Sequence, residues 1–319
     1  MEIKVIAQST ACLRAEPKHA SELVSQTGMG TPVEVLERNA NNWLKIRVPD
    51  GYEAWAEPKA FGNTEFLAAA PSLQSAFSGA PHAYFMVKPP YCFADFTAGR
   101  INLVAGNILR LKSAKASALE SNSIAFLMPD SQTCYLQAQD IIGPVAGSGL
   151  NAFNNSSSQA GKATGTVKVI PMVETAVSFT GVPYLWGGTC PRAFDCSGLV
   201  QFSINMQGLI FPRDAKDQAL IGEERDISDK KTANLQTGDL LFFGEQAGRI
   251  THVAVYLGSG LYVHASGMVQ TNSLHESHPL FEPYRFATWQ GARNISGTAL
   301  KTVFKSFEEF SPAIESSAK

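Results

Sequence analysis

The chain has 319 residues, of which 45% are apolar and 17% are charged, and its formal net charge is −2. This length allows two or three domains and a core large enough to fold without disulfides. The nearly balanced charge excludes tight binding to nucleic acids, which needs a concentrated surface of Lys and Arg to displace counterions.

Five cysteines are spread irregularly along the chain. Because their number is odd, a disulfide framework is not expected and at least one thiol should be free. No two of them form a CxxC pair, so a zinc site is not expected either, and we predict neither a metal nor an organic cofactor. The five are Cys12, Cys92, Cys134, Cys190 and Cys196.

The apolar stretches of the chain are all too short to cross a membrane. The N-terminus, MEIKVIAQST, lacks the basic region and the apolar run that together mark a signal peptide. We therefore expect a cytoplasmic protein or, if a signal was removed, a protein of the cell envelope or periplasm. The sequence leaves both compartments open.

Residues 1–64 contain short apolar runs that are separated by turn residues. The segments TPVEVLE, WLKIRV and GYEAWAE alternate between apolar and polar residues, as half-buried strands do. This pattern predicts a small antiparallel β-barrel. Together with the preceding ACLRAEP, these segments resemble bacterial SH3-like domains.

Residues 78–146 repeat this organisation. The strand-like segments AYFMVKP, GNILRLKS, SIAFLMP and TCYLQAQDI are separated by Pro, Gly, Ser and Asp, which predicts a second SH3-like barrel. Residues 147–165 follow, and they are rich in Gly, Ser and Asn but poor in large apolar side chains. That composition is typical of a linker between domains.

Residues 166–319 form a predicted third domain in which helices precede strands. Apolar residues recur at helical spacing over 169–179, and a second helical pattern runs from Cys196 to about Gly208. The later runs DLLFF, HVAVYLG, LYVHAS and FATWQGA are typical of strands. This order of elements predicts an α+β domain.

Cys196 lies in FDCSGLVQF, where a glycine-rich loop runs into the second predicted helix. A cysteine at a helix N-terminus faces the positive end of the helix dipole and unpaired backbone N–H groups, which should lower the pKa of its thiol. The same N–H groups can stabilise the oxyanion of a tetrahedral intermediate. We therefore predict that Cys196 is a nucleophile, and that the other four cysteines are buried and inert.

Two histidines are placed to serve such a nucleophile. His252 begins the predicted strand HVAVYLG, so the sheet would hold its backbone while its ring points past the strand end toward a thiol on the helix. His264 lies in LYVHAS, and the short LGSGL connection predicts a hairpin that brings it beside His252. A second histidine in that position can orient the first through a hydrogen bond.

Two further clusters are candidates for the walls of a binding site. Tyr184 and Trp186 lie just before the nucleophile loop, where they are either core aromatics or substrate contacts. Arg213 and Asp214 follow the nucleophile helix, and such a pair is usually a solvated ion pair of little energetic value. Near an active site the pair could instead hold a substrate carboxylate or brace the loop.

The segments PYLWGG, DCSGLVQ, FPRDA, GDLLFF, THVAVYLG and YVHAS resemble, in order and spacing, the NlpC family of bacterial cell-wall cysteine peptidases. The resemblance covers residues 166–292. It implies a papain-like α+β fold, with the nucleophile on a helix and its base on the facing sheet. Carried over to this chain, Cys196 is the nucleophile, His252 is the base and His264 is the residue that orients His252.

Two SH3-like domains ahead of such a catalytic domain resemble the subgroup of γ-D-glutamyl-L-diamino acid endopeptidases. These enzymes cleave peptidoglycan-derived peptides that have a free N-terminal L-Ala. Binding its ammonium group requires an anion, for which Asp195 is suited, with Ser197 as an added polar contact. In this subgroup the first SH3-like domain closes one end of the substrate site, and Glu22 and Tyr52 are the candidates for that contribution.

The resemblance implies a monomer that needs no cofactor and acts on peptides, without a nucleic-acid partner or a membrane span. Two other functions remain open. The chain could be a non-catalytic cell-wall-binding protein that keeps the fold, or an amidase or acyltransferase on the same fold. The joint presence of Cys196, His252 and His264 favours a peptidase over a binding protein, because binding needs none of the three.

Overall fold

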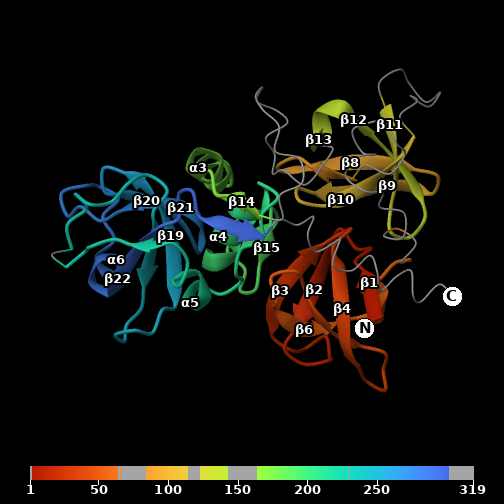
Figure 1. Ribbon diagram of the computed structural model, residues 1–319, viewed down its shortest axis with the longest axis horizontal. Helices are drawn as coiled ribbons and strands as arrows, with labels where there is room; N and C mark the ends of the chain where they lie inside the picture. Colours follow the sequence, from red (N-terminus) through yellow and green to blue (C-terminus); the bar gives the residue numbers. More distant parts are fainter. Residues whose placement is uncertain are drawn as a thin grey trace. The chain divides into compact units, whose positions relative to one another are not determined.

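The computed structural model describes residues 2–63, 66, 84–113, 123–142, 164–228 and 230–301. Most of the predicted linker 147–165 and the C-terminal end of the predicted third domain lie outside the described residues. The chain divides into two compact units, Met1–Gly165 with Lys301–Lys319, and Thr166–Leu300. Figure 1 shows the elements of both units in sequence colours.

The first part of the first unit is a six-stranded antiparallel sheet with the order β1-β4-β5-β6-β2-β3. Inward side chains alternate with outward ones along its short strands, and the inward set includes Leu13, Val33 and Ile46, all fully buried. The strands are β1 (Glu2–Val5), β2 (Thr10–Arg14), β3 (Leu23–Gly28), β4 (Pro32–Arg38), β5 (Leu44–Arg47) and β6 (Glu53–Ala56), followed by the 3₁₀ turn η1 (Pro58–Ala60).

The second part of this unit is a seven-stranded antiparallel sheet with the order β13-β7-β10-β11-β12-β8-β9. Its buried core includes Leu103, Phe126 and, from the loop after β3, Met29. The elements are β7 (Tyr84–Val87), β8 (Tyr91–Phe96), β9 (Gly99–Val104), β10 (Ile108–Ser113), β11 (Ser123–Leu127), β12 (Thr133–Gln137), η2 (Ala138–Asp140) and β13 (Ile141–Ile142).

The prediction that Cys12 is buried is wrong. Cys12 lies on β2 and is exposed, while its neighbours Ala11 and Leu13 are fully buried. Successive side chains of a strand point to opposite faces, so the two apolar neighbours take the core side and Cys12 takes the solvent side. Cys92 and Cys134 are buried in the second sheet, as predicted.

The second unit combines helices with a six-stranded sheet of order β17-β22-β18-β19-β20-β21. The helices are α3 (Val169–Ser178), α4 (Cys196–Asn205), α5 (Ala215–Gln218) and α6 (Pro283–Thr288). The sheet strands are β17 (Glu223–Glu224), β18 (Leu240–Phe243), β19 (His252–Gly258), β20 (Leu261–Ser266), β21 (Met268–Ser273) and β22 (Trp289–Asn294). Two small pairs are β14 (Thr164–Thr166) with β23 (Ala299–Lys301), and β15 (Thr189–Cys190) with β16 (Ala193–Phe194).

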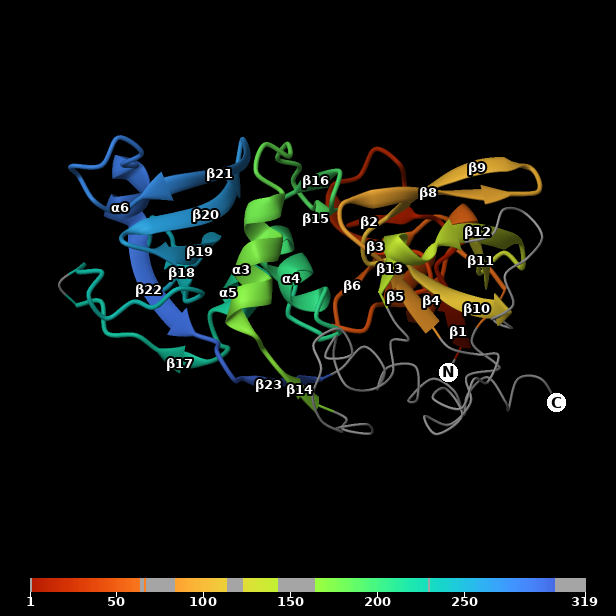
Figure 2. The same cartoon turned by 90° about the horizontal axis from the view of Figure 1, so that it is seen from above.

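Helices α3 and α4 lie side by side and pack against the sheet at β19 and β20 (Figure 2). Every residue of α4 from Cys196 to Ile204 is buried, so this helix forms the centre of the unit. The two predicted helices and the predicted strands at 252 and 261 are confirmed. This packing brings the first residue of α4 toward the first residue of β19.

The predicted strand FATWQGA is only half right, because its first half belongs to a helix. Helix α6 begins at Pro283, and β22 begins only at Trp289. Proline suits the first helical position, since its fixed φ matches the helix and its missing N–H would be unpaired there anyway. The helix that begins at Pro283 ends at Thr288, and the strand follows it.

Candidate active site

Cys196 is the first residue of α4, and Asp195 is its N-cap. The Asp195 backbone is extended (φ −91°, ψ −179°), and its Oδ1 accepts the N–H of Gly198 at 2.7 Å. A carboxylate at this position satisfies a free N–H and is stabilised by the helix dipole. The sequence prediction that Cys196 lies at a helix N-terminus is confirmed.

Gly198 allows the nucleophile loop to lie close to the helix. A Cβ at this position would stand 2.0 Å from the backbone oxygen of Gly188, far inside contact distance. The same oxygen accepts the N–H of Asp195 at 2.9 Å, so the loop closes directly over the helix start. Only glycine permits this approach, which explains why DCSG ends in Gly.

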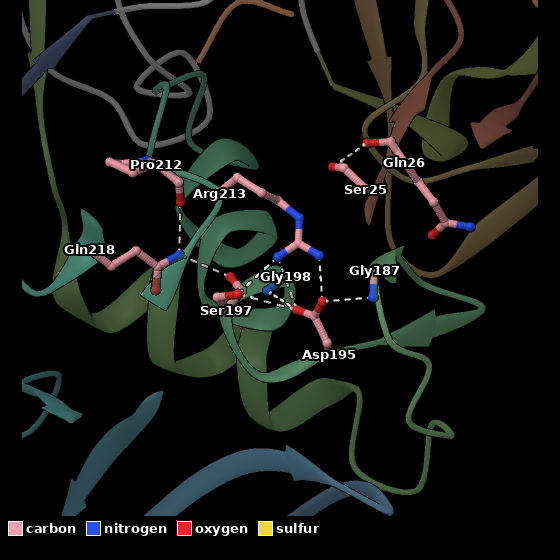
Figure 3. Close-up of polar contacts among 9 residues, drawn as sticks. All are labelled: Ser25, Gln26, Gly187, Asp195, Ser197, Gly198, Pro212, Arg213 and Gln218. Carbon is pink, nitrogen blue, oxygen red and sulfur yellow. Dashed lines mark hydrogen bonds and ion pairs between the residues drawn. The ribbon is translucent and has the colours of Figure 1, made fainter. Parts of the chain in front are cut away.

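The Asp195 carboxylate is the centre of a buried hydrogen-bond network, drawn in Figure 3. Arg213 donates to both of its oxygens, with a distance of 3.1 Å to Oδ1, and the N–H of Gly187 donates to Oδ2 at 2.9 Å. Arg213 also donates to Ser197 Oγ at 2.8 Å. Asp195 and Arg213 are only 5% and 4% exposed, so this is an ion pair withdrawn from water.

The structure shows which carboxylate Arg213 contacts. Arg213 braces the nucleophile loop by pairing with Asp195, not with its neighbour Asp214. Asp214 precedes α5 as its N-cap residue and lies 3.8 Å from Lys216. Gln218 of α5 adds to the brace, because its Nε2 donates to the backbone oxygens of Ser197 and Pro212 at 3.0 and 2.8 Å.

The backbone N–H groups of Val253 and Ser197 lie close enough to the Cys196 thiol to lower its pKa. Val253 directly follows His252, the first residue of β19. Cys196 therefore lies against the end of the strand that carries the predicted base. Cys196 is 7% exposed and His252 is 5% exposed, so both groups sit in a largely water-free environment.

The two histidines and a third residue form a continuous chain of hydrogen bonds. His252 Nε2 lies 2.8 Å from His264 Nδ1, and the two rings are almost perpendicular at 88°. His264 Nε2 in turn lies 2.9 Å from Asn272 Oδ1. The predicted contact between His252 and His264 is confirmed, whereas Asn272 was not among the predicted residues.

Burial decides the protonation of the pair, and it corrects one expectation. Burial raises the pKa of the Cys196 thiol to about 11, with help from the Asp195 charge, and outweighs the backbone N–H groups of Val253 and Ser197 that lower it. Burial also lowers the pKa of His252 well below its ordinary value. Both shifts favour a neutral thiol and a neutral imidazole, whereas the helix N-terminus alone predicted a thiolate.

The remaining predicted residues fall into two groups. Burial raises the pKa of the Tyr184 hydroxyl to about 12, with help from the negative charge of nearby Asp195, so the hydroxyl stays a hydrogen-bond donor. Trp186 is 61% exposed, which makes it a surface ring and not a core aromatic. Glu22 is exposed and Tyr52 half-buried, and both belong to the other unit of the chain.

Arg285 on α6 is a second residue that the sequence analysis missed. Its charge lowers the pKa of both His252 and His264, which places a cation near the two rings. The guanidinium lies 5.9 Å above the ring of Phe243 and donates to Ser266 Oγ at 3.4 Å. No local pattern marks it, because no helix was predicted at 283–288 and the strand predicted at 286–292 begins one residue after it.

Acid is expected to destabilise this unit through His264. Burial lowers the pKa of His264 from 6.5 to about 4. Between these two pH values the ring is protonated in the unfolded chain but neutral in the folded chain. The stabilisation is complete above pH 6.5 and is lost as the pH falls toward 4, by roughly 3 kcal/mol for this residue. Urea denaturation at several pH values measures this loss.

In the matched variants, His264→Asn should reduce the loss of stability between pH 6.5 and 4. His19→Asn changes a side chain that is 77% exposed, so the stability of this variant should depend on pH in the same way as that of the wild type. An undiminished loss in His264→Asn would contradict the assignment of a buried, neutral ring.

Neither a metal centre nor a membrane-spanning helix is found in the described ranges. No group of three or more His, Cys, Asp or Glu side chains there could hold a metal ion. No helix among these residues is long and apolar enough to span a bilayer.

Comparison with known proteins places the chain in a family. Residues 181–285 match the NlpC/P60 family, and residues 9–61 match the bacterial SH3 domain. Dipeptidyl-peptidase 6 of Lysinibacillus sphaericus is 30% identical over 87% of this chain and 93% of its own length. Gamma-D-glutamyl-L-lysine dipeptidyl-peptidase of Bacillus cereus is 24% identical over 86% of this chain and 76% of its own length.

A solved structure shows the same fold. The crystal structure of an NlpC/P60 family protein from Bacillus cereus superposes with a TM-score of 0.70, covering 92% of this chain and 100% of that chain at 21% identity. Likeness along nearly the full length extends the agreement beyond the part that carries Cys196. On these grounds the chain belongs to the NlpC/P60 family and contains a bacterial SH3 domain near its N-terminus.

Proposed function

We propose that this protein is a cysteine peptidase that hydrolyses the γ-D-glutamyl–L-diamino acid bond of peptidoglycan-derived peptides with a free N-terminal L-Ala. Two observations carry the proposal: Cys196 is buried at a helix N-terminus near Val253, which directly follows His252, and His252 is hydrogen-bonded to His264. The names of two relatives, a dipeptidyl-peptidase and a γ-D-glutamyl-L-lysine dipeptidyl-peptidase, agree with this substrate class.

The reaction begins with proton transfer from Cys196 to His252 as the sulfur attacks the γ-glutamyl carbonyl carbon. Because the resting pair is neutral, transfer and attack are coupled, and a bound substrate that excludes water favours them. The carbonyl oxygen becomes an oxyanion. We assign its stabilisation to the backbone N–H of Cys196, which donates to no other group within the described ranges.

Collapse of the tetrahedral intermediate breaks the C–N bond. His252 gives the proton it took from Cys196 to the leaving amine of the diamino acid, and a thioester to Cys196 remains. His252 then removes a proton from water, which attacks the thioester. The dipeptide L-Ala-γ-D-Glu leaves with a new carboxylate, and the thiol recovers its proton.

Substrate recognition is proposed for the residues around this centre. The Asp195 oxygens already accept hydrogen bonds from Arg213 and two backbone N–H groups, so its first task is to hold the loop. Ser197 Oγ also donates to Asp195 Oδ1 at 3.3 Å, so no lone pair of the carboxylate is left over. We propose that Asp195 attracts the substrate's ammonium group through its charge, and that Ser197 and the donor Tyr184 contact the substrate's amino end. Trp186, Asp214, Glu22 and Tyr52 remain predicted contacts of the substrate.

We also propose how the chain is organised around this activity. The sheet of β1–β6 and the sheet of β7–β13 would each be an SH3-like barrel, in domains 1–64 and 78–146, ahead of a catalytic domain at 166–319. Their contribution would be to limit access to short peptides, as the resemblance implies. The protein would act as a monomer in contact with cell-wall peptides.

Three substrates test the proposal: the free peptide, the same peptide with an acetylated N-terminus, and a lipid ester. Free L-Ala-γ-D-Glu-diamino acid should be cleaved with a kcat/KM on the order of 10–100 times that of its N-acetylated form, because capping removes a charge-assisted contact. Release of the dipeptide, followed by chromatography, measures both rates. Equal rates would remove Asp195 and the first sheet from the specificity argument.

The same set separates the alternative functions. Binding of both peptides without cleavage would support a non-catalytic cell-wall-binding protein. Turnover of a lipid ester in preference to either peptide would support an acyltransferase on this fold. The presence of a neutral thiol–imidazole pair sealed from water favours turnover, because a binding protein gains nothing from burying these groups.

A further inference from the structure

Asn272 extends the chain of hydrogen bonds beyond the two histidines. It lies on β21, which pairs with β20 so that His264 is opposite Gln270 and Tyr262 is opposite Asn272. Asn272 is thus a diagonal neighbour of His264 on the same face of the sheet, within reach of a long side chain. Its Oδ1 is 2.9 Å from His264 Nε2.

The orientation of the Asn272 amide follows from its second contact. Its Nδ2 donates to the backbone oxygen of Leu280 at 3.3 Å. A carbonyl oxygen can only accept, so the NH₂ group must face Leu280 and the amide oxygen must face His264. The amide oxygen is likewise only an acceptor, so His264 Nε2 has to carry a hydrogen.

The direction of every other hydrogen bond in the chain then follows. A neutral imidazole with its hydrogen on Nε2 has a lone pair on Nδ1, so His264 Nδ1 accepts the hydrogen of His252 Nε2. His252 is then left with a lone pair on its own Nδ1. That nitrogen is the one available to take the proton of Cys196.

We infer that Asn272 is a positioning residue that fixes the tautomer of His264 and, through it, the tautomer of His252, so that His252 Nδ1 is free to accept the thiol proton. This inference rests on the proposed function for the identity of the base. It adds the residue that selects which of its nitrogens is basic. Without an acceptor at 272, the hydrogen of His264 could move to Nδ1, and His252 would then present an N–H to Cys196.

None of the charged and titratable groups described near the two rings replaces Asn272 as the acceptor for His264 Nε2. Arg285 of α6 is a cation that disfavours protonation of both rings, and the Tyr262 ring of β20 lies 5.1 Å from that of His264. Cys196 lies at the start of α4, near Val253, which follows His252, and the neighbouring Asp195 is paired with Arg213. Among the described residues, no carboxylate contacts His264.

Two substitutions of the same residue separate positioning from structure. Asn272→Asp keeps an acceptor toward His264 but loses the donor to Leu280, while Asn272→Leu loses both. Asn272→Asp should retain most of kcat, and the acid limb of its kcat/KM profile should move up by roughly one pH unit, because the new charge favours imidazolium. Asn272→Leu should lower kcat on the order of tenfold with KM unchanged.

Gln270→Ala is the matched control on the same strand. Gln270 lies directly opposite His264, yet its amide donates to the backbone oxygen of Ser266 at 2.8 Å. This variant should keep the kcat and the pH profile of the wild type. Equal losses in Asn272→Asp and Asn272→Leu, with unshifted profiles, would overturn the inference, because they would trace the effect to the Leu280 contact.

A measurement without substrate keeps this test independent of the proposed function. The rate of Cys196 alkylation by iodoacetamide should fall about tenfold in Asn272→Leu at neutral pH and should keep its wild-type value in Gln270→Ala. If the tripeptide is not hydrolysed but these rates follow the pattern, the proposed function fails and the inference stands. If the tripeptide is hydrolysed and the rates do not differ, the inference is overturned.

Discussion

Replacing Cys196 with alanine is expected to reduce release of L-Ala-γ-D-Glu by about 10⁴-fold or more while the protein stays folded. Covalent catalysis and the paired base act as one unit, so loss of the nucleophile removes the contribution of both. The substitution removes one buried sulfur atom, so it should lower the stability by only about 1 kcal/mol and leave the protein folded. Single-turnover assays and a melting curve on the same sample measure the two effects.

Cys190 provides a closely matched control. It is also a free cysteine, lies six residues earlier on β15, and is 7% exposed, the same fraction as Cys196. Cys190→Ala should retain turnover, because no histidine chain is assigned to it. Unchanged turnover in Cys196→Ala, or a comparable loss in Cys190→Ala, would refute the assignment of the nucleophile.

Replacing Arg213 with alanine should destabilise the second unit by about 3–5 kcal/mol. The substitution leaves the buried carboxylate of Asp195 without its counterion, and an unpaired buried charge is costly. It also removes the donor to Ser197 Oγ. Because Asp195 caps α4, activity should fall together with stability, as measured by the urea midpoint and by dipeptide release.

The exposed pair of Arg100 and Asp95 is the matched control for this prediction. Both side chains are 63% exposed, and the two atoms lie 2.7 Å apart. Solvent screens such a pair, so Arg100→Ala should leave the midpoint in place. If both variants unfold at the same urea concentration as the wild type, the Asp195–Arg213 pair does not hold the helix start.

The elements that carry Cys196, His252 and His264 could be predicted from the sequence because local signals mark them. Asp195 is a good N-cap residue, Gly198 marks a close approach, and the periodicity that follows is helical. The strand beginning at His252 is a continuous apolar run, and its short connection to the strand of His264 implies a hairpin. Such features depend on residues that are close in sequence.

The residues that escaped prediction act through tertiary contacts. The strand that carries Asn272, MVQTNS, has no apolar alternation, and its pairing register decides which side chain reaches His264. Arg213 pairs with Asp195, which lies 18 residues away, although Asp214 is adjacent in sequence. The pKa of Cys196 could not be predicted either, because burial, not the helix dipole, determines its direction.

The neutral, nearly covered thiol of the free enzyme bears on how long the protein survives between encounters with peptides. Peroxides and disulfides react with thiolates that they can reach, and the sulfur of Cys196 is neither ionised nor more than 7% exposed. If the thiol of Cys196 loses its proton only when a peptide binds, its reaction with peroxides and disulfides is limited to the time of turnover. Without a bound peptide, Cys196 should therefore react with oxidants more slowly than an exposed thiolate does.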